Sequence, residues 1–446
     1  MENFLSQLSN ITVILSNVIW PLFIPFLLLV GIYICSQVLL NIRSLTTEKC
    51  KLNILHIIPQ ASVSLGAMMG TGIIIGFLGA LSTLYMGGQV YVEGVALWAL
   101  LGSSVLIPIS YCETLIAKIV NMTPREYIAK FISKNASKLY VVSLTLLYVF
   151  AIGGVQFSGM DAIIITTLDK VAGIQINELQ RYLFIIIPII GVLALVTLRN
   201  RQDVFIRSMI SMILIASITY FVFFGIFLSK TYDYLPMFIN KMVIGFTNPV
   251  SMLFGIPLGL IFGMQRVIQI AEPGLGTLAL AATKTDLNPR VSALISAIMT
   301  TFLVVVSVLV TSYIASYGLN QDIISFEEGS LQRLVSYFET VISVTGGFGL
   351  IVLFIFIILS GMTTLLGSYY LLSQTSKGIF RNKKVIYLSL LLVAGVLSVY
   401  KFEILFNLLN ILLFISTSLN IGALAMFVEF EWSKYKIREN RIQKAA

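Results

Sequence analysis

The sequence is poor in charged residues and in the side chains that build catalytic or metal centres. Only 11% of its 446 residues are charged, and it contains one histidine and three cysteines. Soluble globular proteins carry about 25% charged residues, so this composition excludes an ordinary soluble domain. A single histidine excludes a histidine-based metal centre and a Ser/His/Asp triad, and the cysteines have neither a metal-ligand spacing nor a disulfide framework. We therefore expect neither an enzyme nor a resident cofactor or metal. The start, "MENFLSQLSN", has no basic n-region, so no cleavable signal peptide is expected.

Long apolar runs fill most of the chain. Hydrophobic residues make up 58% of the sequence, and the mean hydropathy is +0.96. With about 20 residues for each crossing of a bilayer, these runs predict an all-α integral membrane protein. Residues 1–446 would form one transmembrane domain with eleven helices. The predicted spans are 12–36, 59–83, 91–117, 139–167, 182–198, 206–229, 247–283, 291–316, 346–374, 385–400 and 404–431.

The net charge of +9 has a topological explanation. Lysine and arginine concentrate in alternate loops, such as residues 118–138, and in the tail 432–446. The positive-inside rule then predicts a plasma-membrane protein with its N-terminus outside and its basic tail in the cytoplasm. Anionic lipid, and not nucleic acid, is the expected partner of this charge.

Two predicted spans are interrupted by glycine and proline. The stretch "MMGTGIIIGFLGA" lies in span 59–83, and span 247–283 contains "AEPGLG" and is too long for one straight crossing. Small residues can simply let helices pack closely, and this alternative applies to each glycine taken singly. Two clusters in matching positions instead indicate unwound backbone, which exposes carbonyls to a cation and amides to a carboxylate.

The positions of the interruptions predict an internal repeat. They are five spans apart, so we set residues 12–36 aside as an extra N-terminal helix. Residues 59–229 and 247–431 then form two five-helix repeats, and the first helix of each is discontinuous. An odd number of spans inverts the second repeat, and the discontinuous helices of such repeats build a site near the middle of the membrane.

The motifs in the two interrupted spans are also informative. They read "GTGIIIGFLGA" and "RVIQIAEPGLG". These stretches resemble the patterns G-x-G-N-I-A-G-V-A and R-G-x-F-S-N-E-A-G-x-G of the alanine/glycine:cation symporter family. The similarity extends over nearly the whole length, and the chain is identified as a divergent member. The residues that match the family are Gly70, Gly72, Ile74, Gly76, Glu113, Gln156, Arg266, Glu272, Gly274, Gly276, Thr363, Thr364 and Asn420.

The resemblance implies a leucine-transporter-like fold and a transport function. The expected activity is secondary active symport of a small neutral amino acid, such as alanine or glycine, by alternating access. A monovalent cation would drive it, and Na⁺ is favoured over H⁺. The candidate substrate-binding residues are Gly70, Thr71, Gly72, Gln156 and Gly274.

The cation would be held by oxygen atoms alone. Hydroxyls and carbonyls suffice for a hard cation when several converge. The alternative is that the hydroxyls bond to their own helix. The candidate cation ligands are the carbonyls of Met69 and Gly70 and the hydroxyls of Thr363 and Thr364.

Ionisable residues inside predicted spans are functional candidates, because charge is costly there. Arg266 and Glu272 lie six residues apart across the expected break. They would form a structural ion pair or an inner gate, unless Arg266 reaches the cytoplasmic edge. Asp161 has no evident partner in the sequence, so it would either carry a proton or lie near the outer surface.

The departures from the family motifs leave a second interpretation open. Ile73, Ile270 and Ala271 stand where the family has polar residues. A membrane sensor or partner protein that keeps the fold but has lost ion coupling would tolerate this change. Ligand binding without flux would distinguish this sensor from a transporter.

Overall fold

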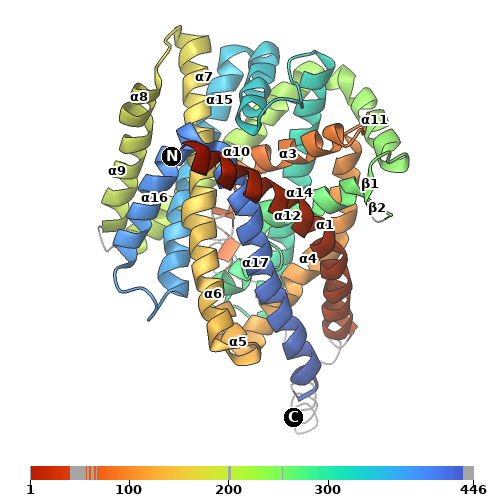
Figure 1. Ribbon diagram of the computed structural model, residues 1–446, viewed down its shortest axis with the longest axis vertical. Coiled ribbons are helices and arrows are strands. Elements are labelled where there is room, and N and C mark those ends of the chain that lie inside the picture. Colours follow the sequence, from red (N-terminus) through yellow and green to blue (C-terminus); the bar gives the residue numbers. More distant parts are fainter. Residues whose placement is uncertain are drawn as a thin grey trace.

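The structure is a computed structural model, and its described part is almost entirely helical (Figure 1). The exception is an antiparallel ribbon of β1 (Met252–Leu253) and β2 (Ile256–Pro257). Part of the predicted span 59–83 and residues 435–446 of the predicted tail lie outside the described residues. The residues described are 2–40, 57, 60–61, 65–66, 68–198, 202–253 and 255–434.

The helices follow one another with short connections. In the first half they are α1 (Glu2–Leu40), α3 (Gly72–Met86), α4 (Gly94–Val120), α5 (Pro124–Phe131), α6 (Lys134–Thr145), α7 (Gly153–Ala172), α8 (Glu178–Arg181), α9 (Ile187–Leu198) and α10 (Gln202–Thr231). In the second half they are α11 (Leu235–Thr247), α12 (Leu258–Ala271), α13 (Thr277–Ala282), α14 (Pro289–Asn320), α15 (Ser330–Thr375), α16 (Lys383–Tyr400) and α17 (Phe402–Phe430). Short π or 3₁₀ segments join some of them: η2 (Leu146–Ile152), η3 (Tyr182–Ile186) and η4 (Tyr232–Tyr234).

The described helices account for the predicted spans. Nine helical segments in this part of the chain are long and apolar enough to cross a bilayer, and α3 and α12 are two shorter apolar helices. The nine coincide with predicted spans, whereas α3 and α12 occupy the two spans expected to be interrupted. The chain is therefore an all-α, multi-pass membrane protein. The count of eleven crossings and the inverted relation of the repeats stay predictions.

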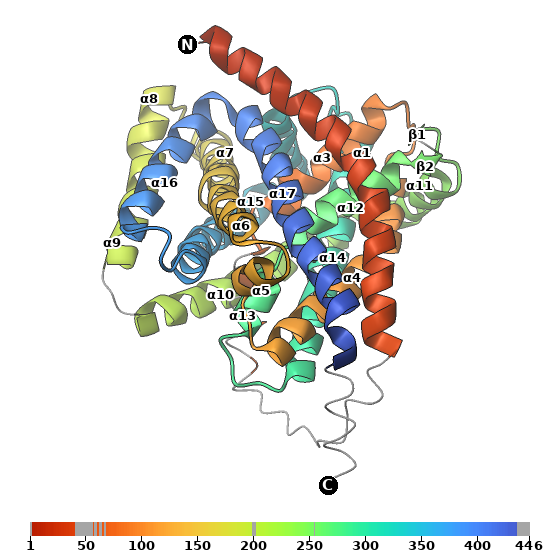
Figure 2. The same ribbon diagram turned by 60° about the horizontal axis from the view of Figure 1, so that its bottom comes forward.

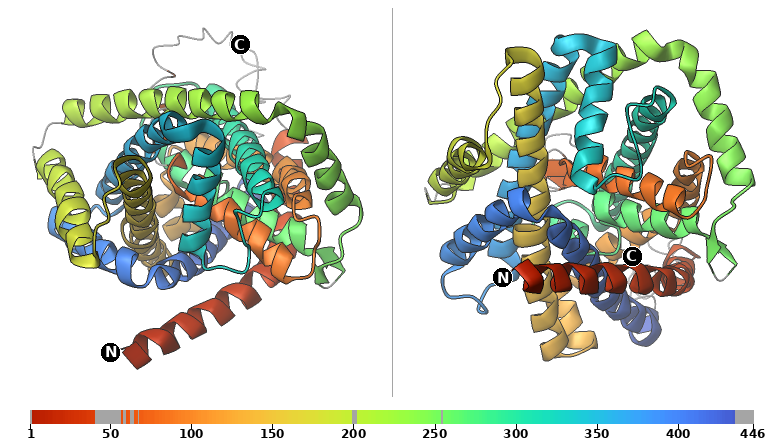
Figure 3. Two further views of the ribbon diagram at one scale, coloured as in Figure 1. Left: turned by 90° about the horizontal axis from the view of Figure 1, so that it is seen from above. Right: turned by 45° about the horizontal axis from the view of Figure 1, so that its top comes forward.

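Two helices lie at the periphery of the bundle. Figure 2 shows α1 running along the outside beside α17, and Trp20 of α1 donates a hydrogen bond to the carbonyl of Asn410, at 3.2 Å. Figure 3 shows α10 lying across another side, where it packs against α15. The outer position of α1 fits a helix added to a repeat-built core.

The first interruption is confirmed, but it is shorter than the glycine pattern suggested. Residues 69–71 are not helical, and α3 begins at Gly72. Gly76 and Gly79 lie inside α3, so the expectation that they help to unwind the span was wrong. A Cβ atom on Gly76 or Gly79 would lie 3.1 Å or 3.4 Å from a polar side chain of α12. These two glycines therefore let α12 approach closely, which is the packing role of small residues in membranes.

The second interruption is also confirmed. The helix α12 ends at Ala271, and α13 does not begin before Thr277. Between them, Glu272, Gly274 and Gly276 have φ values of 57°, 80° and 91°. Backbone in this left-handed region favours glycine, so the "PGLG" stretch supplies what the break requires.

The segment before the ninth predicted span differs from expectation. The sequence predicts an outer loop with a short surface helix over residues 317–345, but α15 begins at Ser330 and continues to Thr375. It is bent at Gly346, where φ is 69° and ψ is −171°. The surface helix and the span are thus two helical pieces joined at one glycine.

Candidate functional site

The break in the first interrupted span is held by a glutamine from α7. The backbone N–H and the hydroxyl of Thr71 both donate to Oε1 of Gln156, each at 2.9 Å. The hydroxyl also lies 3.2 Å from the carbonyl of Val155. Thr71 and Gln156 are buried. The structure thus brings together two of the predicted substrate residues, and it shows Gln156 stabilising the unwound backbone.

Two glycines make this contact possible. A Cβ atom on Gly70 would lie 2.6 Å from the amide of Gln156, and one on Gly159 would lie 2.5 Å from the side chain of Thr71. A Cβ atom on Gly72, in contrast, would have nothing within 4 Å. Gly70 therefore has a packing reason for being glycine, whereas Gly72 has open space beside it.

The threonines of α15 lie next to the first interrupted span. The hydroxyls of Thr363 and Thr364 donate to the carbonyl of Ser360, at 2.8 Å and 3.0 Å. The hydroxyl of Thr364 also lies 3.4 Å from the carbonyl of Gly66. The alternative of bonding within one helix therefore describes these side chains, and Thr364 alone of the two reaches across to Gly66 within the described residues. Met69 meets α10 instead, where Ser217 donates to its sulfur at 3.5 Å.

The break in the second interrupted span is surrounded by polar groups. Glu113 of α4 is fully buried, and its Oε2 accepts from the N–H of Gly276 at 3.3 Å and from the amide of Asn420 at 3.1 Å. The same amide donates to the carbonyl of Gly274 at 2.8 Å. These bonds satisfy backbone groups that a continuous helix would have paired. The carbonyl of Gly274 is thus occupied by α17, and its assignment to the substrate stays a prediction.

Two tyrosines that the sequence did not indicate complete this arrangement. Tyr140 of α6 donates to the carbonyl of Leu275 at 2.8 Å, and Tyr127 of α5 donates to the side chain of Asn420. Burial raises the pKa of Tyr127 well above its ordinary value, so the phenol keeps the proton that it donates. A tyrosine in a loop helix carries no sequence signal for such a role.

The ion pair expected between Arg266 and Glu272 is not formed. Glu272 follows the last residue of α12 with a left-handed backbone, and its carboxylate accepts from the hydroxyl of Thr277. Helical side chains meet at spacings of three or four residues, not six, and the end of the helix separates the two groups further. Their role in gating stays a prediction.

Arg266 has amide partners instead of a carboxylate. Its Nη1 donates to Oε1 of Gln269 at 2.7 Å and to Oδ1 of Asn410 at 3.0 Å. The guanidinium also lies 4.8 Å from the centre of the Phe406 ring. Arg266 is buried, which excludes the expectation that it reaches the aqueous edge.

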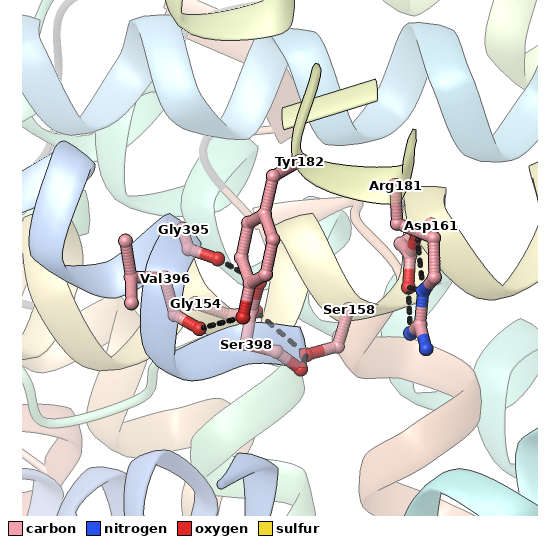
Figure 4. A network of polar contacts seen from close by, with 8 residues as sticks. All are labelled: Gly154, Ser158, Asp161, Arg181, Tyr182, Gly395, Val396 and Ser398. Carbon is pink, nitrogen blue, oxygen red and sulfur yellow. Dashed lines mark hydrogen bonds and ion pairs between the residues drawn. The ribbon is translucent and has the colours of Figure 1, made fainter. Parts of the chain in front are cut away.

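Asp161 has a partner that the sequence did not reveal. Figure 4 shows Arg181 facing its carboxylate, and Nε of Arg181 lies 3.2 Å and 3.0 Å from the two carboxylate oxygens. Nearby, the hydroxyl of Ser158 donates to the carbonyl of Ser398 at 2.9 Å. These contacts tie α7 to α8 and α16, so Asp161 has a structural role in this part of the fold.

Comparison with known proteins gives one informative similarity. No protein-family model matches the chain, and neither does any curated protein. Among solved structures, the chain is similar to the substrate-bound outward-open state of a Na⁺-coupled sialic acid symporter, with a TM-score of 0.50. The identity is 12%, and the match covers 92% of this chain and 86% of that chain. At this identity the similarity shows a shared fold, and membership of the alanine/glycine:cation symporter family stays a prediction.

Proposed function

We propose that the chain is a secondary active transporter in which a cation gradient drives symport. The observation that carries the proposal is the pair of broken spans, each held by polar groups of neighbouring helices. Interrupted backbone is tolerated at membrane depth where it is buried in protein or lines a cavity, and transporters use it to build a central site. The fold shared with a Na⁺-coupled symporter supports the same function and speaks against an enzyme.

Sodium is the proposed coupling ion. Thr363 and Thr364 of α15 present hydroxyl oxygens beside the first interrupted span, and Thr364 already approaches the carbonyl of Gly66. Together with carbonyls of Met69 and Gly70, they would provide neutral oxygen ligands of the kind that a hard cation requires. A hydroxyl that donates to its own helix keeps lone pairs for a cation, so the bonds to Ser360 do not exclude this role.

The proposed substrate is a small neutral amino acid, such as alanine or glycine. Gly70, Thr71, Gly72 and Gln156 lie at the start of α3 and on the facing part of α7. Gly274 would contribute from the second break. Substrate entry would replace some of the bonds between Thr71 and Gln156, and rocking of one repeat against the other would expose the site to each side in turn.

The remaining assignments follow from topology. The protein would lie in the plasma membrane with its N-terminus outside and its C-terminus in the cytoplasm, because basic residues concentrate in alternate loops. Its partners would be the lipid bilayer, the cation and the substrate, without a resident cofactor.

The test is uptake by the purified full chain in liposomes. An inward Na⁺ gradient should drive accumulation of radiolabelled alanine or glycine above its equilibrium level, and replacement of external Na⁺ by choline should abolish accumulation. Uptake that follows a pH gradient without Na⁺ would replace the ion but keep the mechanism. Absence of cation-dependent uptake for any amino acid would exclude this function.

One observation favours the sensor interpretation as a second candidate. Ile73, Ile270 and Ala271, which replace polar residues of the family motifs, are all buried among apolar core residues. They contribute nothing to ion binding. Saturable ligand binding without accumulation in liposomes would support a sensor or partner protein.

A further inference from the structure

A group of buried hydrogen-bond donors on α12 and α17 lacks acceptors. Among the described residues, Nε of Arg266, Nε2 of Gln269 and Nδ2 of Asn407 have no hydrogen-bond partner. Arg266 and Gln269 are only 4% and 8% exposed. A buried polar group without a partner is costly, and native structures contain few of them. All three groups are donors, so what is missing is an acceptor.

The charge of Arg266 is also uncompensated. In the described part of the chain no carboxylate forms an ion pair with it, and the charged residue close enough to act on it is another cation, Arg333. Its direct partners are the neutral amides of Gln269 and Asn410. An isolated charge within a membrane-spanning bundle is expensive and marks a functional site.

The group lies between the two interrupted spans. Arg266 and Gln269 sit on α12, one turn apart on the same face, and α12 packs against α3 and α17. Gly76 and Gly79 of α3 leave room for these side chains. Asn407 lies one turn before Asn410 on α17, so their amides share a face.

The backbone amides of the breaks are largely engaged elsewhere. The N–H of Thr71 donates to Gln156, that of Leu275 to the carbonyl of Glu272, and that of Gly276 to Glu113. An anionic group entering this region would find few free amides there. The unpaired donors beside Arg266 are the better acceptor-binding set.

We propose that Arg266 and Gln269, assisted by Asn407, bind the carboxylate of the transported substrate. The inference rests on the proposed function, and it moves the carboxylate from the helix breaks to α12. The guanidinium fork supplies charge and directional donors, and the ring of Phe406 holds it from one side. The substrate class is then a small molecule that carries a carboxylate, and its amide analogue is excluded because the amide carries no charge.

The first experiment compares matched probes with the purified full chain in detergent. Propionate and propionamide, and alanine and alaninamide, are titrated while thermal unfolding is followed at constant NaCl. The carboxylates should raise the Tm saturably, whereas the amides should not. Equal stabilisation by each amide would overturn the proposal, and so would stabilisation by chloride equal to that by propionate. No stabilisation by either carboxylate in the millimolar range would overturn it as well.

Variants locate the binding groups. Arg266→Gln and Gln269→Leu should each weaken carboxylate binding at least about tenfold, as expected when a charge-assisted hydrogen bond is lost. Gln265→Leu is the matched control, because this buried glutamine of the same helix has an unpaired acceptor and not an unpaired donor. If Arg266→Gln fails to fold, Gln269→Leu and Arg266→Lys still test the site. Unchanged carboxylate affinity in Gln269→Leu, or an equal loss in Gln265→Leu, would contradict the proposal.

Uptake measurements separate this inference from the proposed function. Cation-driven alanine uptake with an unchanged half-saturating concentration in Arg266→Gln would overturn the carboxylate site and leave the transport function standing. Arg266-dependent propionate binding in a wild-type chain that shows no uptake would support the site and exclude the transport function.

Discussion

Gln156 accepts two hydrogen bonds from Thr71, one from the backbone and one from the hydroxyl, and so holds the non-helical segment before α3 against α7. The contact joins residues 85 positions apart in the sequence. A backbone amide released by the break is thus paired by a side chain from another span, which is how buried irregular backbone is tolerated in a membrane.

We predict that Gln156→Leu destabilises the protein by about 1 to 3 kcal/mol, because the two donors of Thr71 lose their shared acceptor in a buried site. Alanine uptake should fall with it. Thermal unfolding in detergent measures the first effect. Gln175→Leu is the control, since Gln175 is exposed and bonds to the nearby side chain of Asp169. A Gln156→Leu variant that unfolds at the wild-type temperature would show that this bond contributes nothing.

A pair of alanine substitutions tests the geometry of the same break. Gly70→Ala should lower the Tm strongly, because its Cβ would lie 2.6 Å from Gln156, whereas Gly72→Ala should leave the Tm unchanged, because nothing lies within 4 Å. Gly72 lies at the start of α3, where alanine is also the better helix former. Equal unfolding temperatures for the two variants would contradict the close contact.

The proposed cation site predicts a specific loss of Na⁺ dependence. Thr364→Ala should raise the Na⁺ concentration for half-maximal uptake about tenfold, and Thr364→Ser should restore it, because only the hydroxyl oxygen is required. Thr340→Ala is a matched control, since this buried threonine of α15 also bonds to its own helix. Wild-type Na⁺ dependence in Thr364→Ala would remove this residue from the site.

The Asp161–Arg181 pair should contribute to stability and not to coupling. Asp161→Asn leaves a largely buried guanidinium without its anion, which costs about 3 kcal/mol. Glu339→Gln, which breaks the exposed pair with Lys170, should cost less than about 1 kcal/mol. Thermal unfolding compares the two. If Asp161 carried the coupled proton, Asp161→Asn would instead abolish the pH dependence of uptake in protein that is still folded.

The fold was predictable to a considerable extent, since bilayer spans depend on local composition. The apolar runs, and the two interrupted spans marked by Gly70 and by "PGLG", follow from hydropathy and backbone freedom. Hydropathy also placed the helices flanking residues 317–345, but it could not show that a bend at Gly346 joins the surface helix to the next span.

The site was predictable only in part. The glycine motif led to Gly70 and Thr71, and the family resemblance led to Gln156, Glu113 and Asn420. Which groups these side chains contact was not in the sequence. Tyr127 and Tyr140 were missed, because their role depends on a break in another span.

Sequence alone determined where this chain crosses the membrane and where its helices are interrupted, because hydrophobicity and glycine content act locally along the chain. Only the tertiary structure decided the partners of the polar groups. It placed Arg266 among amides and separated it from Glu272, and it paired Asp161 with Arg181. The physical reason is that a buried hydrogen bond or ion pair depends on distance and direction between side chains from different helices, and helix packing sets both.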